Sequence, residues 1–192
     1  MLKIGLTGGI GSGKTTVGKV FMQLGVPVYV SDDRSKYLMQ KNESLKTSLT
    51  SLFGENTFLN GKLNRSYIAS TVFSNTNKLN ELNDLVHPYV KKDFETWLAS
   101  QDANYIIKEA AILFETGASK FLDKVILVES PEKLKIQRIM LRDSLKREEI
   151  IERMSKQWSD LVKRTYADYI ILNDERASLI EQILKLHKIF NF

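Results

Sequence analysis

Short aliphatic runs alternate with helical periods along much of the chain, and this alternation predicts the fold class. The run Leu2–Thr7 leads directly into glycines, as a buried strand leads into a turn. After it, four apolar residues recur at the spacing of one helix face: Val17, Val20, Phe21 and Leu24. Gly25 predicts the end of this helix. The chain therefore opens with a strand, a glycine-rich loop and a helix.

Four further aliphatic segments predict the rest of a sheet: Val26–Val30 and residues 104–114, 124–130 and 168–172. Helical stretches separate them, which is typical of a wound parallel sheet. A last helix, near 175–190, carries an apolar stripe formed by Leu179, Ile183, Leu186 and Phe190. The sequence thus predicts an α/β fold with three layers, in which helices cover both faces of a five-stranded parallel sheet.

Two regions depart from this pattern. Between about 40 and 101 the sequence changes to polar helical periods, and from 131 to about 165 it forms a long charged helical stretch. Because 192 residues suit one compact domain, we expect a single domain with a core made of 1–39, 102–131 and 166–192. The regions of about 40–101 and about 132–165 are then a helical insert and a helical lid.

The composition excludes several classes of function. The chain has no cysteine, which excludes disulfides, thiol nucleophiles and thiolate zinc sites. Its two histidines disfavour an imidazole metal site. We find neither a signal peptide nor 18 consecutive apolar residues, so we expect a cytoplasmic protein that does not span a membrane. The net charge of +5 favours an anionic partner.

The glycine loop indicates which anion. Gly8, Gly13, Lys14 and Thr15 satisfy the pattern G-x-x-x-x-G-K-[ST] between a strand and a helix. Glycines let backbone N–H groups face a phosphate chain, Lys14 reaches the β- and γ-phosphates, and the Thr15 hydroxyl is a ligand for Mg²⁺. The residues expected to bind the nucleotide are Gly9, Gly11, Ser12, Gly13, Lys14, Thr15 and Thr16. We therefore predict a P-loop that binds ATP with Mg²⁺.

Acidic residues follow two of the strands. Asp32 and Asp33 come after the second strand, at the sheet edge where α/β proteins bind ligands, so one of them can accept a proton from an attacking hydroxyl. Alternatively, Ser31, Asp32 or Asp33 only caps the helix that begins near Arg34. Glu109 and Glu115 lie at the end of the third strand, where an acidic group can hold Mg²⁺, although Glu115 could instead pair with a surface lysine.

The charged stretch has six basic residues and one acidic residue between positions 133 and 147. Arg138 and Arg142 are four apart and share a helix face, so they can close over a transferring phosphoryl group. The alternative is a solvated basic face or a nucleic-acid patch. The stretch, however, lacks the aromatic residues between its arginines that base stacking requires. A GTPase is disfavoured because the nearest guanine-type string, "NKLN" at 77–80, ends in Asn instead of Asp.

Nearly the whole chain resembles the dephospho-CoA kinase family. The resemblance rests on "LTGGIGSGKT", "LGVPVYVSDD", "LFG", "NGKLNR", "LNDLVHP", "ILFE", "QRIMLRD" and "ADYIILND", in that order. It implies transfer of the ATP γ-phosphoryl group to the ribose 3′-hydroxyl of dephospho-CoA. Within it, Asp32 matches the catalytic aspartate, the insert binds the acceptor, and 132–165 is the lid.

The resemblance also assigns residues to roles. Those implied in catalysis are Asp32, Lys14, Arg138 and Arg142, and those implied near the nucleotide, beside the P-loop, are Arg142, Arg147 and Asn173. Those implied at the acceptor are Asp32, Arg65, His87, Leu113, Phe114 and Glu115, and those implied at the metal are Thr15, Asp32 and Glu109. His87 could instead only cap a helix that begins at Pro88.

The chain departs from the family at three positions: Val30 stands where the family has the first aspartate of a pair, Ala111 replaces a proline, and Thr15 replaces the usual P-loop serine, to which it is chemically equivalent. Asp32 is then the sole candidate base on its strand. We expect ATP and dephospho-CoA as partners, a monomer or weak homo-oligomer, and neither nucleic acid nor membrane binding. The open alternatives are another small-molecule or nucleoside monophosphate kinase, a nucleotide-sensing module and a nucleic-acid-dependent ATPase.

Overall fold

The computed structural model of the chain describes residues 1–73 and 75–191, and it divides into two compact units. The first unit contains Met1–Val30 and Asp102–Phe192, and the second contains Ser31–Gln101. The helical insert expected at about 40–101 thus lies in a unit that begins earlier, directly after a strand of the sheet. Asp32 consequently belongs to the second unit, whereas the glycine loop belongs to the first.

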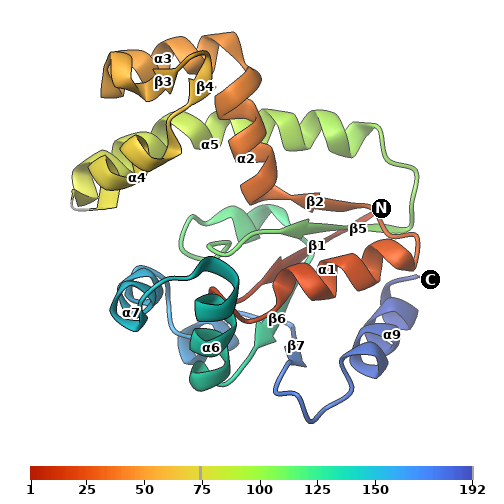
Figure 1. The fold of residues 1–192 in the computed structure, drawn as a ribbon. Coiled ribbons are helices and arrows are strands. Elements are labelled where there is room, and N and C mark those ends of the chain that lie inside the picture. The colour runs from red at the N-terminus through yellow and green to blue at the C-terminus, as the bar shows by residue number, and fades with distance from the viewer. Residues whose placement is uncertain (74, 192) are drawn as a thin grey trace. The chain divides into compact units, whose positions relative to one another are not determined.

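A five-stranded parallel sheet forms the centre of the first unit (Figure 1). Its strands are β1 (Leu2–Thr7), β2 (Val28–Val30), β5 (Tyr105–Glu109), β6 (Lys124–Glu129) and β7 (Tyr169–Leu172), in the order β2-β5-β1-β6-β7. All neighbouring strands are parallel, so their carboxyl ends meet at one edge. The predicted five-stranded parallel sheet is confirmed.

Helices cover the sheet of the first unit. On one face, α1 (Lys14–Gln23) and α9 (Leu179–Phe190) bury Val17, Phe21 and Ile183 against strand residues such as Ile4 and Ile107. On the other face, the segment after β5 and the short helix η2 (Ala118–Phe121) form a second apolar cluster. The stripe predicted for the last helix is confirmed, because its positions lie in the first of these cores.

Asp168 ties the beginnings of two strands together. Its carboxylate accepts hydrogen bonds from the backbone N–H of Val125 and from Lys124 Nζ, each at 2.8 Å. Burial acts to raise the pKa of Asp168, but these hydrogen bonds and the nearby Lys124 charge outweigh it, so the pKa lies below its ordinary value. The carboxylate therefore stabilises the fold in its ionised form.

The charged stretch is helical, as expected, and contains three helices: α6 (Glu132–Asp143), α7 (Arg147–Ser155) and α8 (Asp160–Arg164). Two other local expectations for the first unit are wrong. The third strand ends at Glu109, so that Glu115 lies in a turn beyond it. The last helix begins at Leu179, because Ser178 caps it by accepting a hydrogen bond from the N–H of Glu181.

The second unit is mostly helical and has its own apolar core. Its elements are α2 (Ser31–Lys41), α3 (Glu43–Phe53), η1 (Glu55–Thr57), β3 (Phe58–Leu59), β4 (Lys62–Leu63), α4 (Arg65–Phe73) and α5 (Thr76–Ala99). The buried residues of the core are Leu38, Leu45, Leu49, Phe53 and Val86. None of the helices in the described residues has the length and apolar character that crossing a bilayer requires.

The helix expected to begin at Pro88 begins much earlier. Asn75 caps α5 by accepting a hydrogen bond from the N–H of Lys78, and the helix runs through Pro88 to Ala99. Proline in a helix interior removes one backbone hydrogen bond. Here Val86 and Phe94 are buried on either side of it, which offsets that cost. His87 therefore does not cap a helix.

Candidate phosphate-binding site

The glycine loop joins β1 to α1 in the conformation that its residues predict. The backbone of Gly11 and of Gly13 has φ values of 80° and 95°, in the left-handed region that favours glycine. Gly13 directly precedes Lys14, the first residue of α1, so the positive end of the helix faces the loop. The loop thus has the strand-loop-helix geometry of an anion-binding site.

Lys14 lies over the start of the loop. Its side chain is largely buried, and its Nζ donates to the carbonyl oxygens of Gly8 at 2.8 Å and Gly9 at 3.3 Å. The next residue, Thr15, donates from Oγ1 to Oε1 of Glu109 at 3.3 Å. The structure therefore brings together two of the predicted metal residues, while Thr16 is exposed on the first turn of α1.

Two side chains from distant parts of the chain hold the loop from outside. Asn173, which follows β7, donates from Nδ2 to the carbonyl oxygen of Ser12 at 2.8 Å. Gln157, between α7 and α8, accepts a hydrogen bond at 2.9 Å from the backbone N–H of Ile10. The sequence singled out Asn173 only through the family resemblance. It gave no signal for Gln157, because nothing local marks a contact across about 150 residues.

The arginines of the lid have different partners. Arg138 donates to Ser130 Oγ and Glu175 Oε1, each at 3.0 Å, and it also reaches Asn173. Arg142 instead forms two hydrogen bonds with its neighbour Asp143, at 2.7 and 2.8 Å. This contact raises the pKa of Arg142 and holds the pKa of Asp143 below its usual range.

The two arginines therefore differ in their surroundings. Arg138 lies beside Asn173, which holds the phosphate loop, whereas the Arg142 side chain is 63% exposed. Arg147 is exposed at the start of α7.

Glu115 lies in a buried polar network. It forms an ion pair with Lys163 of α8 at 2.9 Å and accepts a hydrogen bond from the backbone N–H of Trp158 at 3.0 Å. Lys163 is fully buried and also donates to the carbonyl oxygen of Ala111 at 2.7 Å. The alternative that Glu115 pairs with a surface lysine is thus wrong, because its lysine partner is in the interior.

The other residues assigned to the acceptor lie in both units. Leu113 and Phe114 are buried in the apolar cluster beneath the sheet in the first unit. In the second unit, Asp32 is exposed on the first turn of α2, Arg65 is exposed at the start of α4, and His87 is exposed on α5. Their roles stay predictions.

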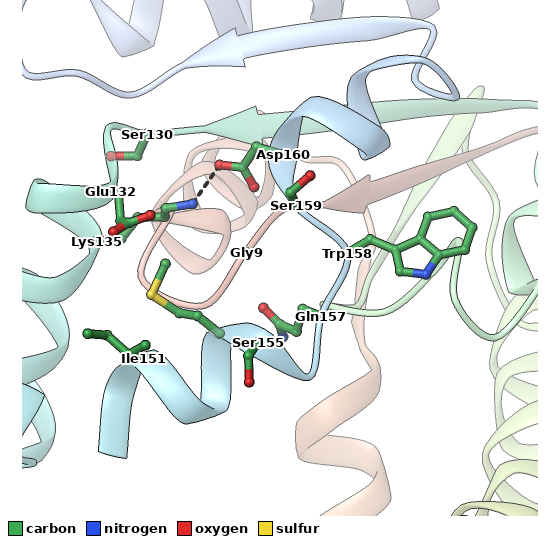
Figure 2. Close-up of a pocket in the computed structure, with 11 residues that line it drawn as sticks. Gly9, Ser130, Glu132, Lys135, Ile151, Ser155, Gln157, Trp158, Ser159 and Asp160 are labelled. Atoms are coloured by element: carbon green, nitrogen blue, oxygen red, sulfur yellow. Dashed lines mark hydrogen bonds and ion pairs between the residues drawn. The ribbon is translucent and has the colours of Figure 1, made fainter. Parts of the chain in front are cut away.

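A cavity of about 480 Å³ adjoins the start of the loop, within the first unit (Figure 2). Gly9 forms part of its wall, and lid residues Lys135, Gln157 and Asp160 form another part. Figure 2 shows Lys135 and Asp160 in contact, and the distance between Lys135 Nζ and Asp160 Oδ2 is 2.7 Å. Helices α6 and α8 thus supply a cation and an anion next to the phosphate loop.

The arrangement can hold a nucleotide phosphate chain and can offer oxygen ligands to a divalent cation. The described residues contain no group of three or more His, Cys, Asp or Glu side chains that could hold a metal alone. Mg²⁺ does not need such a group, since it usually takes one or two protein oxygens and completes its shell with phosphates and water. The hydroxyl of Thr15 and the carboxylate of Glu109 fit that requirement.

Comparisons with known proteins agree with this geometry. The profile of the dephospho-CoA kinase family matches residues 2–178. A dephospho-CoA kinase from Bacteroides fragilis is 39% identical over 186 residues, which cover 96% of this chain and 91% of that protein.

Solved structures are also similar to this chain over nearly its full length. A Thermus thermophilus protein has a TM-score of 0.88 at 32% identity, covering 98% of this chain and 96% of that one. The dephospho-CoA kinase of Campylobacter jejuni has a TM-score of 0.71 at 26% identity, with the same coverage of both chains. The chain, with its P-loop and parallel sheet, belongs to the dephospho-CoA kinase family.

Proposed function

We propose that the chain is an ATP-dependent kinase that phosphorylates the 3′-hydroxyl of dephospho-CoA, giving coenzyme A and ADP. Membership of the family supports the substrate pair. The observation that carries the proposal is the P-loop, in which a largely buried Lys14 lies over Gly8 and Gly9 at the start of the helix α1. A cation beside a helix N-terminus supports the binding of a triphosphate.

In this proposal the loop holds the phosphates and does not react. The backbone N–H groups of Gly9, Gly11, Ser12 and Gly13 would donate to the phosphate oxygens, and Lys14 would neutralise charge between the β- and γ-phosphates. The N–H of Ser12 would exchange its present partner, the carbonyl oxygen of Gly9 at 3.1 Å, for a phosphate oxygen. Asn173 supports the loop through its bond to Ser12. Thr16, on the first turn of α1, is a further proposed contact of the nucleotide phosphates. Positioning and electrostatic stabilisation therefore carry most of the rate.

Thr15 and Glu109 would hold Mg²⁺, which supplies charge neutralisation at the phosphates when it is bound. The hydrogen bond between the two side chains brings their oxygens within 3.3 Å of each other. Asp32 is the third proposed metal residue and also orients the nucleophile. It accepts the proton of the acceptor hydroxyl as that oxygen bonds to the γ-phosphorus and the bond to the ADP oxygen breaks.

The remaining residues bind the acceptor or cover the reaction. Arg65 and His87 of the second unit are the proposed contacts of dephospho-CoA there, together with Leu113, Phe114 and Glu115 of the first unit. Arg138, Arg142 and Arg147 stabilise the negative charge that spreads over the phosphoryl group. For Arg142 this requires exchange of Asp143 for phosphate, because the two now share two hydrogen bonds.

We further propose that the chain works in the cytoplasm as a monomer or weak homo-oligomer, without nucleic acid. The absence of cysteine and the small-molecule substrates support this setting. Transfer to water should be slow without acceptor, because a lid that closes over the site excludes water.

The proposal is tested by incubating the purified chain with ATP, Mg²⁺ and a panel of acceptors: dephospho-CoA, adenosine monophosphate and shikimate. We expect phosphorylated product with dephospho-CoA, and little ADP without any acceptor. Asp32→Asn should retain ATP binding and lose turnover, whereas Asp33→Asn, next to it on α2, is the matched control and should keep both. Phosphorylation of another acceptor in preference to dephospho-CoA would contradict the proposal.

A further inference from the structure

A second lysine lies against the start of the phosphate loop. Lys135 of α6 is only 9% exposed, and its Nζ pairs with Asp160 Oδ2 at 2.7 Å. A methyl group built on Gly9 would lie 3.4 Å from this Nζ and 3.3 Å from Asp160 Oδ1. Both charged groups therefore lie in the space that a side chain at Gly9 would fill, at the wall of the cavity described above (Figure 2).

The loop itself fixes the position of Lys135. A methyl group built on Gly11 would lie 2.6 Å from the backbone carbonyl oxygen of Lys135 and 3.0 Å from the side chain of Ile139. Ile139 is buried, so α6 packs directly on the loop at this point. Asp160, in contrast, comes from the five-residue helix α8. The backbone of Lys135 thus packs on the phosphate loop, whereas Asp160 lies at the start of a separate helix.

Gly9 marks the end of the loop where the terminal phosphates are expected. The Nζ of Lys14 contacts the carbonyl oxygens of Gly8 and Gly9, and the lysine of a P-loop reaches the β- and γ-phosphates. Lys135 approaches the same glycine from the lid. A second ammonium group at this end can donate a charge-assisted hydrogen bond to the γ-phosphate, in a partly buried place where salt screens little.

The carboxylate of Asp160 has the same sign of charge as the phosphates it would face. Like charges held close together in a partly buried site are unfavourable, and each lowers the affinity of the site for the other. We propose that the γ-phosphate of ATP replaces Asp160 on Lys135. Lys135 is then a further phosphate-binding residue, and Asp160 is the counter-ion that it leaves when ATP binds. This inference rests on the proposed function only in that the nucleotide is ATP.

The test measures nucleotide binding by titration calorimetry, with a non-hydrolysable ATP analogue and with ADP, in the presence of Mg²⁺ and without acceptor. Lys135→Gln should weaken binding of the ATP analogue by about tenfold or more, the usual effect of a lost charged hydrogen bond, and should weaken ADP binding less. Lys135→Arg should restore most of the affinity. Asp160→Asn should strengthen binding of the analogue about threefold, because the phosphate no longer has to displace a carboxylate from Lys135.

Two matched variants control for charge alone. Lys133→Gln removes an exposed positive charge from the same helix, and Glu152→Gln removes an exposed negative charge from α7. Both variants should bind the analogue and ADP with affinities within about twofold of that of the unmodified chain, because salt largely screens exposed charges. Thermal unfolding of every variant shows whether it is folded. If Lys135→Gln does not fold, the increase expected for Asp160→Asn and the retention expected for Lys135→Arg decide the matter.

A purely structural ion pair would give a different result. Lys135→Gln and Asp160→Asn would then weaken binding together, with equal losses for the ATP analogue and ADP, and this result would overturn the inference. So would an Asp160→Asn variant whose affinity is unchanged. These outcomes are separate from the acceptor assay: a chain that binds ATP but does not phosphorylate dephospho-CoA contradicts the proposed function and leaves the binding comparison intact.

Discussion

Replacing Gly11 by alanine tests the direct contact between the phosphate loop and α6. Gly11 has a φ of 80°, and the added methyl group would lie 2.6 Å from the backbone oxygen of Lys135. Gly25, just after α1, provides a matched control. Its φ is 81°, and none of the described atoms lies within 4 Å of a methyl group built on it. The two substitutions share the backbone strain and differ in the contact.

The expected energies follow from these two terms. A left-handed conformation costs an alanine about 1–2 kcal/mol, and the lower entropy of the unfolded chain returns about 0.4–1 kcal/mol. Gly25→Ala should therefore lower the free energy of unfolding by at most about 1.6 kcal/mol. Gly11→Ala should lose a further amount of about 1–3 kcal/mol, typical of overpacking, because a backbone oxygen cannot rotate away.

Urea unfolding followed by circular dichroism measures both losses, and calorimetry with an ATP analogue measures binding. We expect Gly25→Ala to bind normally and Gly11→Ala to bind at least about tenfold more weakly, because α6 has to move off the loop and take Lys135 with it. If both variants lost the same stability and bound ATP equally well, the packing of α6 on the loop would be refuted.

Three further predictions concern single side chains. Lys163→Met should lower the free energy of unfolding by about 3–5 kcal/mol because it leaves the Glu115 carboxylate buried without its cation, and urea unfolding should show partial recovery in Lys163→Met/Glu115→Gln; equal losses in both would contradict the buried pair. The Asp168 pKa is lowered by folding, so its stabilisation is present above the unfolded pKa of about 3.9 and is lost as the pH falls through the folded pKa. The difference in unfolding free energy between the unmodified chain and Asp168→Asn should be constant from about pH 7 to 5 and shrink below about pH 4; a gap that does not shrink in acid would refute this. Glu109→Gln should raise the Mg²⁺ concentration needed for half-maximal kinase activity by about tenfold or more, and an unchanged Mg²⁺ dependence would argue against Glu109 at the metal.

Local patterns were sufficient for the sheet and for the loop. The aliphatic runs gave all five strands, since strands buried on both faces read as continuous apolar segments. The glycine spacing gave the loop, because few other contexts require left-handed backbone at Gly11 and Gly13 directly before Lys14. Both features depend on residues that are close together in the sequence.

Features that depend on tertiary packing were not predictable in this way. Nothing near Pro88 shows that buried neighbours carry a helix through it. The pairs Lys135 with Asp160 and Glu115 with Lys163 join residues far apart in the sequence, so no spacing marks them. The second unit begins at Ser31 because α2 starts immediately after β2. No glycine or proline lies at this boundary, so the sequence carries no local signal for it.

The most direct test of the central claim follows the phosphoryl group itself. The purified chain is incubated with Mg²⁺, dephospho-CoA and ATP labelled in its γ-phosphoryl group, and the product is examined by mass spectrometry and phosphorus NMR. The account predicts one labelled phosphate on the ribose 3′-oxygen for each ADP formed, and loss of this transfer in Lys14→Ala. Label released as free phosphate, or transfer that persists undiminished without Lys14, would contradict it.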